Sequence, residues 1–389
     1  MKIGNREIGL DHPPYVIAEI GVNHDGEVSR ALELTDAAAE AGADAVKLQY
    51  FETDRLMSKA AKLAVYQKAA GETDPIAMLR RLELTLDEMV LVVDRAHERG
   101  IHAIVTVFST ELVERAEALA WDAYKTASPD IVNKPLLDRL AHTGKPMIVS
   151  SGASTLDEVV RAVGWLESVR DRLAVLQCVS CYPAPQMALG GIKAIANVIE
   201  LPVGYSDHNV FTSGAGAVSY GACMLEKHIT YDCKAQGPDH KASLWEGMFA
   251  EYVRLAKTAK AEGRSSIDKM YESRGMVREP LGLDLRLYLQ SSLFTSKTEA
   301  GNAFGVDHNP IEKRVLDCER DVRAVSRQSV VSVGPIQTGT TITREHLTIK
   351  RPGTGILAYR LDEVIGSTAT RDIEADVPLT EADLAGVPA

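Results

Sequence analysis

The sequence has few cysteines, few aromatic residues and no surplus of positive charge. Its 389 residues include five cysteines, an odd and small number that argues against a disulfide framework. Lys and Arg total 43 against 54 Asp and Glu, a net charge of -11, whereas nucleic-acid-binding proteins normally have a basic surplus. A run of about 18 apolar residues, which a membrane-spanning helix needs, is missing. The first residues lack the apolar core of a signal peptide, so we expect a cytoplasmic protein with no membrane or nucleic-acid partner.

A glycine-rich dinucleotide-binding fingerprint is also missing. An open doubly wound sheet usually carries G-x-G-x-x-G after its first strand, but here the first expected strand ends at Glu19 and continues as IGVNHDG. Cys178 and Cys181 have the spacing of a metal or redox pair, yet no second pair at matching spacing accompanies them. We interpret both as ordinary thiols at the end of a strand.

Residues 15–265 alternate short β-type runs with amphipathic helical segments, as at 28–41, 86–99, 156–169 and 246–261. Eight such units predict a parallel sheet, which we interpret as a closed (β/α)8 TIM barrel, with an open doubly wound sheet as the alternative. The expected strands are Tyr15–Ile20, Asp44–Gln49, His102–Phe108, Ala123–Thr126, Pro146–Ser150, Leu173–Cys178, Pro202–Tyr205 and Cys223–Lys227.

The alternation ends near residue 265, and two further parts follow. Residues 266–325 are charged, with scattered Gly and Arg, and predict a long connection with one helix near 281–293. Residues 326–389 are rich in β-branched residues and contain a weak repeat, in which 334–347 parallels 371–384. We therefore predict a barrel over 1–265, a connection over 266–325 and a small β-rich domain over 326–389.

Polar side chains stand at the ends of the expected strands, where a barrel places its active site. Lys47 and Lys125, together with serines from other strands, could hold a phosphate or phosphate-carboxylate anion. A lone lysine at a strand end is usually solvated, but Lys47 lies in the apolar run AVKL, where a buried charge needs a partner. Glu19, in IAEI, either faces the site or forms a salt bridge to one of these lysines.

His208 and His228 follow the seventh and eighth strands, which are neighbours in a barrel. Two imidazoles at adjacent strand ends, with carboxylates near, suit a divalent ion such as Mn2+ or Zn2+. Two histidines 20 residues apart are otherwise more often structural, and it is their matched positions that favour a metal site.

Ordered sequence blocks around these residues resemble the sialic acid synthase family. One more block, near the C-terminus, resembles that family's antifreeze-like domain, a β-clip module also called SAF. The blocks are IAEIGVNH (17–24), AVKLQ (45–49), YKTAS (124–128), VSSG (149–152), CVSCYP (178–183), GYSDH (204–208), EKH (226–228), GPDHKASL (237–244) and KRPGTG (350–355). The resemblance covers about residues 1–265 and 326–389.

The resemblance implies that phosphoenolpyruvate condenses with the aldehyde of an open-chain N-acyl hexosamine, giving a nonulosonic 2-keto-3-deoxy acid and phosphate. It implies a metal, Mn2+ or alternatively Mg2+, on His208 and His228, with Glu19 as the acid/base group. It also implies a domain-swapped homodimer in which the small domain lends Arg351 to the other chain's barrel. The residues implied to bind phosphoenolpyruvate are Lys47, Thr110, Lys125, Ser128, Ser150, Ser180 and Ser206, and those implied to face the sugar are Gln49, Asp130, Tyr182, Asp239 and Arg351.

Two other functions stay open at this point. A metal-dependent barrel aldolase acting on keto acids would explain His208, His228 and Glu19, but would leave the lysines and serines without a role. A non-catalytic carbohydrate-binding relative is the other alternative. Asp130 stands where many members of the family have Glu, so the sequence leaves the acceptor open among N-acetylmannosamine and the legionaminic and pseudaminic precursors.

Overall fold

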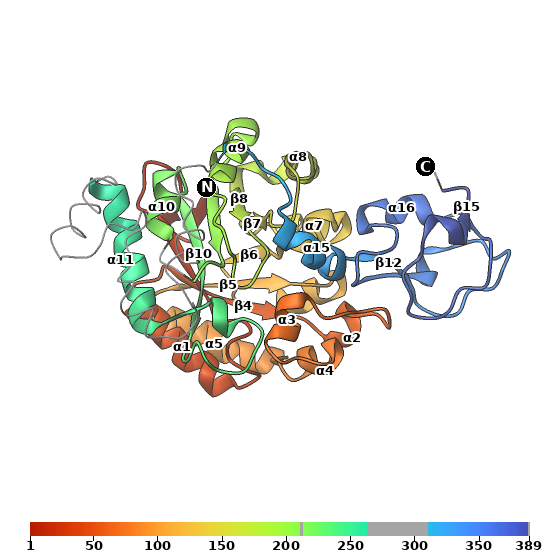
Figure 1. Ribbon diagram of the computed structural model, residues 1–389, viewed down its shortest axis with the longest axis horizontal. Helices are drawn as coiled ribbons and strands as arrows, with labels where there is room; N and C mark the ends of the chain where they lie inside the picture. Colours follow the sequence, from red (N-terminus) through yellow and green to blue (C-terminus); the bar gives the residue numbers. More distant parts are fainter. Residues whose placement is uncertain (211–212, 263–309, 388–389) are drawn as a thin grey trace.

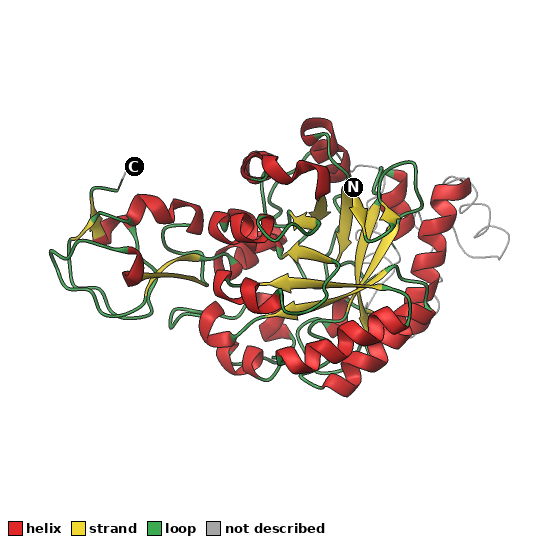
Figure 2. Cartoon of the chain, turned by 180° about the vertical axis from the view of Figure 1, so that it is seen from behind, coloured by secondary structure: helices red, strands yellow, loops and turns green. Residues whose placement is uncertain are grey.

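Eight parallel strands form a closed barrel with helices around it (Figures 1 and 2). The computed structural model describes residues 1–210, 213–262 and 310–387. The barrel strands are β3 (Tyr15–Glu19), β4 (Ala45–Tyr50), β5 (His102–Val107), β6 (Ala123–Thr126), β7 (Met147–Ser150), β8 (Leu173–Cys178), β9 (Val203–Asp207) and β10 (Met224–Thr230). Strand β10 pairs with both β9 and β3, which closes the barrel, and β11 (Leu244–Trp245) extends it beside β10. The predicted (β/α)8 barrel is confirmed, and the open sheet is excluded.

Several helices that cover the barrel, α5 and α8 among them, begin at sequence signals typical of helix caps. Thr85 and Thr155 each accept the backbone N–H three residues on, and Glu88 and Glu158 bond back to the cap. The predicted segment 156–169 divides at Leu166, which leaves helical geometry. The helices are α1 (Val28–Glu40), α2 (Thr53–Leu56), α3 (Val65–Ala69), α4 (Pro75–Arg80), α5 (Leu86–Glu98), η1 (Thr110–Leu112), α6 (Val113–Ala116), η2 (Ser128–Val132), α7 (Lys134–Ala141), α8 (Leu156–Trp165), η3 (Glu167–Arg172), α9 (Gly190–Ile199), α10 (Gly214–Ser219), η4 (His240–Ala242) and α11 (Glu246–Glu262).

The two-residue period of the strands decides which side chains enter the barrel. In β3, Val16 and Ala18 pack outward against helices, whereas Ile17 packs inside. One end of the interior is apolar and is filled by Tyr15, Ile17, Ala45, Ile104, Ala123, Ile148, Ala174, Leu176 and Met224. The hairpin of β1 (Lys2–Ile3) and β2 (Arg6–Glu7) adds Ile3 and Ile8 to this core. The next inward positions along the strands therefore lie above a filled apolar floor.

Residues after 326 form a separate β-rich unit beside the barrel, drawn in darker blue in Figure 1. Its elements are β12 (Ser329–Ser332), η7 (Arg344–His346), β13 (Leu347–Lys350), η8 (Ala358–Arg360), α16 (Leu361–Val364), β14 (Thr368–Ala369), η9 (Glu381–Asp383) and β15 (Leu384–Ala385). The sequence repeat is visible in the fold, because Ile336 and Ile373 hold equivalent places in it and pair through two hydrogen bonds of 2.9 and 2.8 Å. The small β-rich domain is thus confirmed.

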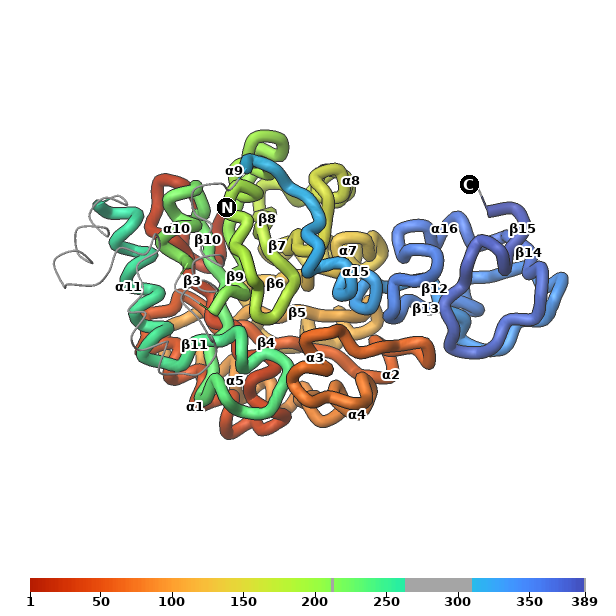
Figure 3. The backbone as a smooth tube through the Cα atoms, in the orientation of Figure 1, coloured from red at the N-terminus to blue at the C-terminus, as the bar shows by residue number. Residues whose placement is uncertain are grey.

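Residues 310–326, which include the described part of the predicted connection (310–325), lie against the barrel (Figure 3). They include η6 (Asp317–Glu319) and α15 (Arg320–Ser326). Arg323 and Arg327 both donate to the Glu158 carboxylate of α8, with N–O distances of 2.7 to 2.9 Å. Burial alone would raise the pKa of Glu158, but hydrogen bonds from the two arginines outweigh it and lower that pKa. These pairs anchor the small domain to the barrel.

Part of the expected connection, with the helix predicted near 281–293, lies outside the described residues. Within the described ranges, no helix is long and apolar enough to cross a bilayer.

Candidate active site

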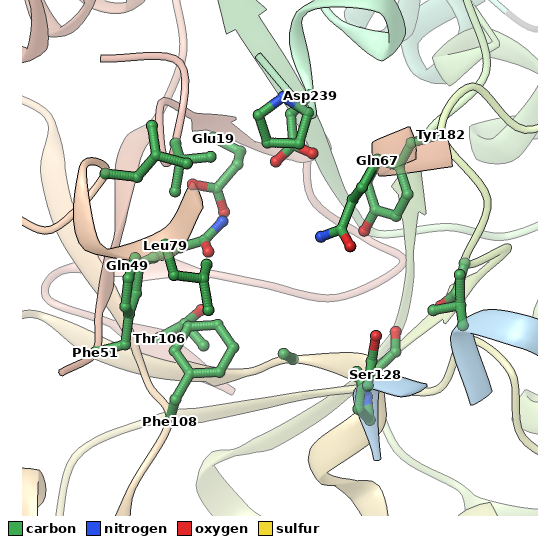
Figure 4. A pocket seen from close by; sticks show the side chains of 18 of the residues that line it. Glu19, Gln49, Phe51, Gln67, Leu79, Thr106, Phe108, Ser128, Tyr182 and Asp239 are labelled. Carbon is green, nitrogen blue, oxygen red and sulfur yellow. The ribbon is translucent and has the colours of Figure 1, made fainter. Parts of the chain in front are cut away.

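A cavity lies at the C-terminal ends of the barrel strands, above the apolar floor (Figure 4). It contains about 890 Å3 of space, part of it open to solvent. Most of the predicted site residues line it, although they come from distant parts of the chain. They are Glu19, Lys47, Gln49, Lys125, Ser128, Ser180, Tyr182, His208, His228, Asp239 and Arg351.

Two lysines and two glutamates form a buried cluster of alternating charge in this cavity. Lys47 contacts the Glu19 carboxylate and lies 3.9 Å from Glu226, while Lys125 lies 2.9 Å from Glu226. Burial lowers the pKa of Lys47 to about 7, although Glu226 opposes that shift. Burial would raise the pKa of Glu226, but Lys125 and Lys47 outweigh it and lower the pKa to about 2. Each charge therefore has a partner of opposite sign, which a buried ion requires.

Glu226 is the central residue to which the sequence analysis gave no role. It lies two positions before His228 on β10, so the strand period places both side chains in the cavity. Lys227 between them points elsewhere, and its ammonium bonds the carbonyl oxygens of Asp207 and Asn209 on either side of His208. The alternation within EKH could have identified Glu226 as an inward carboxylate.

The hydroxyl beside Lys47 belongs to Thr106 on β5, which accepts from the Lys47 ammonium at 3.1 Å. Thr110, the residue expected there, lies in η1 beyond the end of the strand, half-buried and outside the cavity lining. The expectation for Thr110 is therefore corrected to Thr106. On β5, which ends at Val107, Thr106 faces the cavity, whereas Thr110 lies three residues beyond the end of the strand, in η1.

Four serines gather around Gly152 and the cluster, but in two layers. Ser128 and Ser180 line the cavity, whereas Ser150 and Ser206 lie behind them. Ser128 Oγ donates to Ser150 Oγ at 3.0 Å and accepts the Gly152 N–H at 3.0 Å, and Ser206 Oγ donates to Glu226 at 2.9 Å. Ser180 Oγ is buried with no hydrogen-bond partner in the described structure. An unsatisfied buried hydroxyl at a cavity wall is suited to a polar ligand.

His208 and His228 meet in the cavity with their ring centres 5.6 Å apart. His208 Nδ1 donates to the Val179 carbonyl at 2.8 Å, so Nε2 is the nitrogen that carries the ring's lone pair, with Ser206 Oγ 3.5 Å away. Burial lowers the pKa of His208 to about 4 and that of His228 further below its usual value. His228 Nδ1 is buried without a partner and lies 3.9 Å from Asp239. Both imidazoles are therefore neutral and chemically suited to bind a divalent ion.

The described residues contain no set of three or more His, Cys, Asp or Glu side chains arranged around a common metal position. An ion held by His208 and His228 would therefore take its other ligands from water or substrate.

Arg351 reaches the cavity from β13's end, through the small domain of the same chain. Its backbone N–H donates to Leu56 at 2.8 Å, and its carbonyl accepts from Ser58 N–H at 3.1 Å. The resemblance implies that this arginine comes from a partner subunit, whereas here it lies over its own barrel.

Asp130 lies behind the cavity lining and is fully buried in η2. Neither carboxylate oxygen has a hydrogen-bond partner in the described structure. Burial raises the pKa of Asp130 to about 7, although the charge of Arg351 opposes the shift. The predicted sugar contact of Asp130 is therefore not direct in this geometry.

The remaining wall of the cavity was not predicted from the sequence. Tyr66 and Gln67 enter from α3, and the Tyr66 ring lies 4.9 Å from the Tyr182 ring. The apolar side chains of this wall are Val22, Phe51, Leu56, Met78, Leu79, Leu82 and Phe108. Phe51 and Phe108 directly follow β4 and β5, whereas Leu56, Met78, Leu79 and Leu82 come from the long segment between β4 and α5, which α2, α3 and α4 interrupt.

Comparison with known proteins agrees with this architecture of a catalytic barrel and a small β-rich domain. The NeuB family model matches residues 34–266, and a SAF domain model matches residues 327–385. The chain is 32% identical to an N,N'-diacetyllegionaminic acid synthase of Legionella pneumophila, covering 94% of this chain and 93% of the relative. It is 30% identical to an N-acetylneuraminate-9-phosphate synthase of Mus musculus, covering 89% and 85%.

A solved structure of the spore coat polysaccharide biosynthesis protein SpsE from Bacillus subtilis superposes with a TM-score of 0.75 at 26% identity, and the match covers 99% of each chain. The fold and site define a barrel protein with a charged cavity at its strand ends and a SAF domain beside it. The chain belongs to the NeuB family, which confirms the resemblance carried by the sequence blocks.

We predict that Gly152→Ala weakens binding of phosphoenolpyruvate, the ligand implied by the resemblance, by about tenfold or more. A Cβ at this position would lie 2.1 Å from Ser180 Oγ and 2.7 Å from Ser128 Oγ, and would displace both hydroxyls. Calorimetric titration of the purified variant measures the change. Gly164→Ala is the matched control, since a Cβ there meets no atom within 4 Å. Equal affinities for the two variants would show that the serines do not bind the ligand.

Proposed function

We propose that this protein condenses phosphoenolpyruvate with the aldehyde of an open-chain N-acyl hexosamine, giving a nonulosonic 2-keto-3-deoxy acid and phosphate. The observation that carries the proposal is one cavity in which two buried lysines and an unsatisfied serine lie beside two neutral imidazoles. Membership of the NeuB family supports it, as do relatives named as synthases of N,N'-diacetyllegionaminic acid and N-acetylneuraminate 9-phosphate.

The lysine and serine side of the cavity would bind phosphoenolpyruvate. An ammonium group has three donors, so Lys47 and Lys125 can bind the phosphate while each keeps a contact with a glutamate. Ser128 and Ser180 would add hydroxyl donors, and Ser150 would hold Ser128 in place. The cluster is preorganised for an anion, because its charges are fixed before the ligand arrives.

The imidazole side would hold a divalent metal, Mn2+ or alternatively Mg2+, on His208 and His228. Such an ion supplies Lewis acidity at the aldehyde oxygen of the sugar. Gln49, Tyr182, Asp239 and Arg351 line the cavity around this position. They would orient the sugar so that its aldehyde carbon faces phosphoenolpyruvate.

The reaction then forms one carbon–carbon bond and consumes one water molecule. C3 of phosphoenolpyruvate attacks the aldehyde carbon, and water adds at C2. Glu19 lies at the junction of the two sides, with Oε1 held by the Gly21 N–H at 2.8 Å and Oε2 against Lys47. It would take the proton from the attacking water and pass it to the aldehyde oxygen, which becomes a hydroxyl group. The bond between C2 and the phosphate oxygen then breaks as the C2 hydroxyl gives its proton to the phosphate, so that C2 becomes the ketone and phosphate leaves against Lys47 and Lys125.

We also propose that the protein works in the cytoplasm as a domain-swapped homodimer. Residues 310–387 make contacts that could equally be made on a partner's barrel, and the chain between 263 and 309 lies outside the described residues. The extensive docking of Arg351, Arg323 and Arg327 on the barrel supports a site that is complete only with a small domain in place.

Release of inorganic phosphate tests the reaction. The protein with Mn2+ and phosphoenolpyruvate should release phosphate only when an acceptor is added, from a panel of N-acetylmannosamine and diacetamido-trideoxyhexoses. Mass spectrometry should show the acceptor enlarged by three carbons.

His228→Ala should abolish metal-dependent turnover with the fold retained, as measured by circular dichroism. An aldolase would release no phosphate, and turnover of His228→Ala at the wild-type kcat would contradict the metal assignment.

Co-expression of two inactive variants with different tags tests the domain swap. In a His228→Ala/Arg351→Ala heterodimer with swapped domains, the intact barrel receives the intact Arg351, so one complete site forms and activity returns. Without swapping, neither barrel has both residues, and the purified heterodimer stays as inactive as its parents. That second result would contradict the proposed exchange.

A further inference from the structure

A glutamate outside the cavity holds the backbone that forms the serine side of the site. Glu319 of η6 is 1% exposed and does not line the cavity. Its Oε1 accepts the backbone N–H groups of Ala153 and Ser180, both at 2.7 Å, and its Oε2 accepts that of Leu316 at 2.9 Å. Ala153 and Ser180 follow β7 and β8, so one carboxylate ties together the two loops that carry Gly152 and Ser180.

The backbone N–H and the backbone carbonyl of Ala153 both form hydrogen bonds with residues of the same segment. Its N–H donates to Glu319, and its carbonyl accepts from Arg323 at 2.6 Å and from Arg327 at 3.3 Å. Ala153 has a φ of 51°, in the left-handed region that residues other than glycine adopt at a cost. The loop next to Gly152 is therefore kept in an unfavourable conformation by hydrogen bonds from residues 319–327.

Two neighbouring contacts strengthen this junction. Cys318 and Cys181 pack against the same apolar cluster of Val179, Ala184 and Leu316, and residues 318–319 lie beside residues 180–181. Lys313 is buried on the same segment and carries the charge opposite to Glu319, whose field raises the Lys313 pKa against the larger lowering by burial. A buried carboxylate is costly without partners, and Glu319 has three N–H donors and a nearby ammonium. In Figure 3 this segment runs past β8 and β7 toward α15.

We infer that Glu319 is a positioning residue for phosphoenolpyruvate, and that through it the docking of residues 310–326 completes the phosphoenolpyruvate side of the site. The inference rests on the proposed function. Glu319 cannot touch the ligand, because it does not line the cavity. It acts by holding the Ser180 amide, and so directs the unsatisfied Ser180 hydroxyl into the cavity. Charge-assisted hydrogen bonds of this kind are stronger than neutral ones.

Calorimetric titration of phosphoenolpyruvate, without acceptor sugar, tests the inference on Glu319→Ala, Glu319→Gln and the control Asp317→Ala. The Asp317 side chain is 91% exposed on the same short helix. We expect Glu319→Ala to weaken binding by about tenfold or more. Glu319→Gln should recover part of the loss, because its amide oxygen can still accept from Ala153 and Ser180. Asp317→Ala should bind as the wild type does.

Steady-state kinetics separates positioning from a general structural role. For Glu319→Gln, which keeps the size of the side chain, we expect the KM for phosphoenolpyruvate to rise while the KM for the sugar stays within about twofold. Wild-type affinity in Glu319→Ala would overturn the inference, as would an equal rise of both KM values with loss of thermal stability. If the wild type binds no phosphoenolpyruvate, the proposed function fails and this inference fails with it. If the wild type binds phosphoenolpyruvate and the Glu319 variants bind it equally well, this inference fails and the proposed function stands.

Discussion

The buried cluster of Glu19, Lys47, Lys125 and Glu226 is the constraint around which the barrel interior is organised. Four ions leave water when the chain folds, and each is tolerated because its neighbour has the opposite charge. Well-packed apolar residues could replace such pairs at little cost or with a gain in stability. The cluster is therefore better explained by what it can bind than by the stability it provides. It sets two buried ammonium groups at the wall of the cavity, where they attract an anion more strongly than in water.

The two-residue period of the strands determines where the charged and polar side chains of the site lie. The apolar floor fills one end of the barrel, so polar groups can occupy only the strand ends. Lysines and serines from β4, β6 and the β8 loop lie on one side, and the imidazoles after β9 and on β10 lie on the other. Glu19 on β3 stands between them. The residues proposed to bind phosphoenolpyruvate and those proposed to bind the metal thus lie close together, because the barrel strands that carry them end at one rim.

The sequence was most informative where local pattern determines structure. Short apolar β-type runs that alternate with helical segments predicted the eight strands, and Lys47 in its apolar run was correctly expected to be buried with a partner. The two copies of the sequence repeat in the small domain pair with each other through Ile336 and Ile373. These features depend on periods of two or 3.6 residues and on short spacings, which a single sequence displays.

The sequence was least informative where distant segments meet. Thr106 was missed in favour of Thr110, because the inward register depends on where β5 ends. Glu319 and its partners Ala153 and Ser180 are separated by more than 130 residues, and no local pattern links them. Arg351 was expected at the site only through resemblance. Long-range placement of this kind follows from how loops pack, which hydrophobic periodicity does not encode.

The most direct test of the central claim compares Lys125→Met, Glu226→Met and the double variant. Unfolding by denaturant should show Glu226→Met losing about 3–5 kcal/mol, because it leaves the buried Lys125 ammonium unpaired. Lys125→Met should lose less, because Glu226 keeps Lys47 at 3.9 Å. The double variant should recover most of that stability and yet fail to bind phosphoenolpyruvate in a calorimetric titration. A double variant that binds phosphoenolpyruvate as tightly as the wild type would contradict the account, because the charged cluster would then have no role in the ligand site.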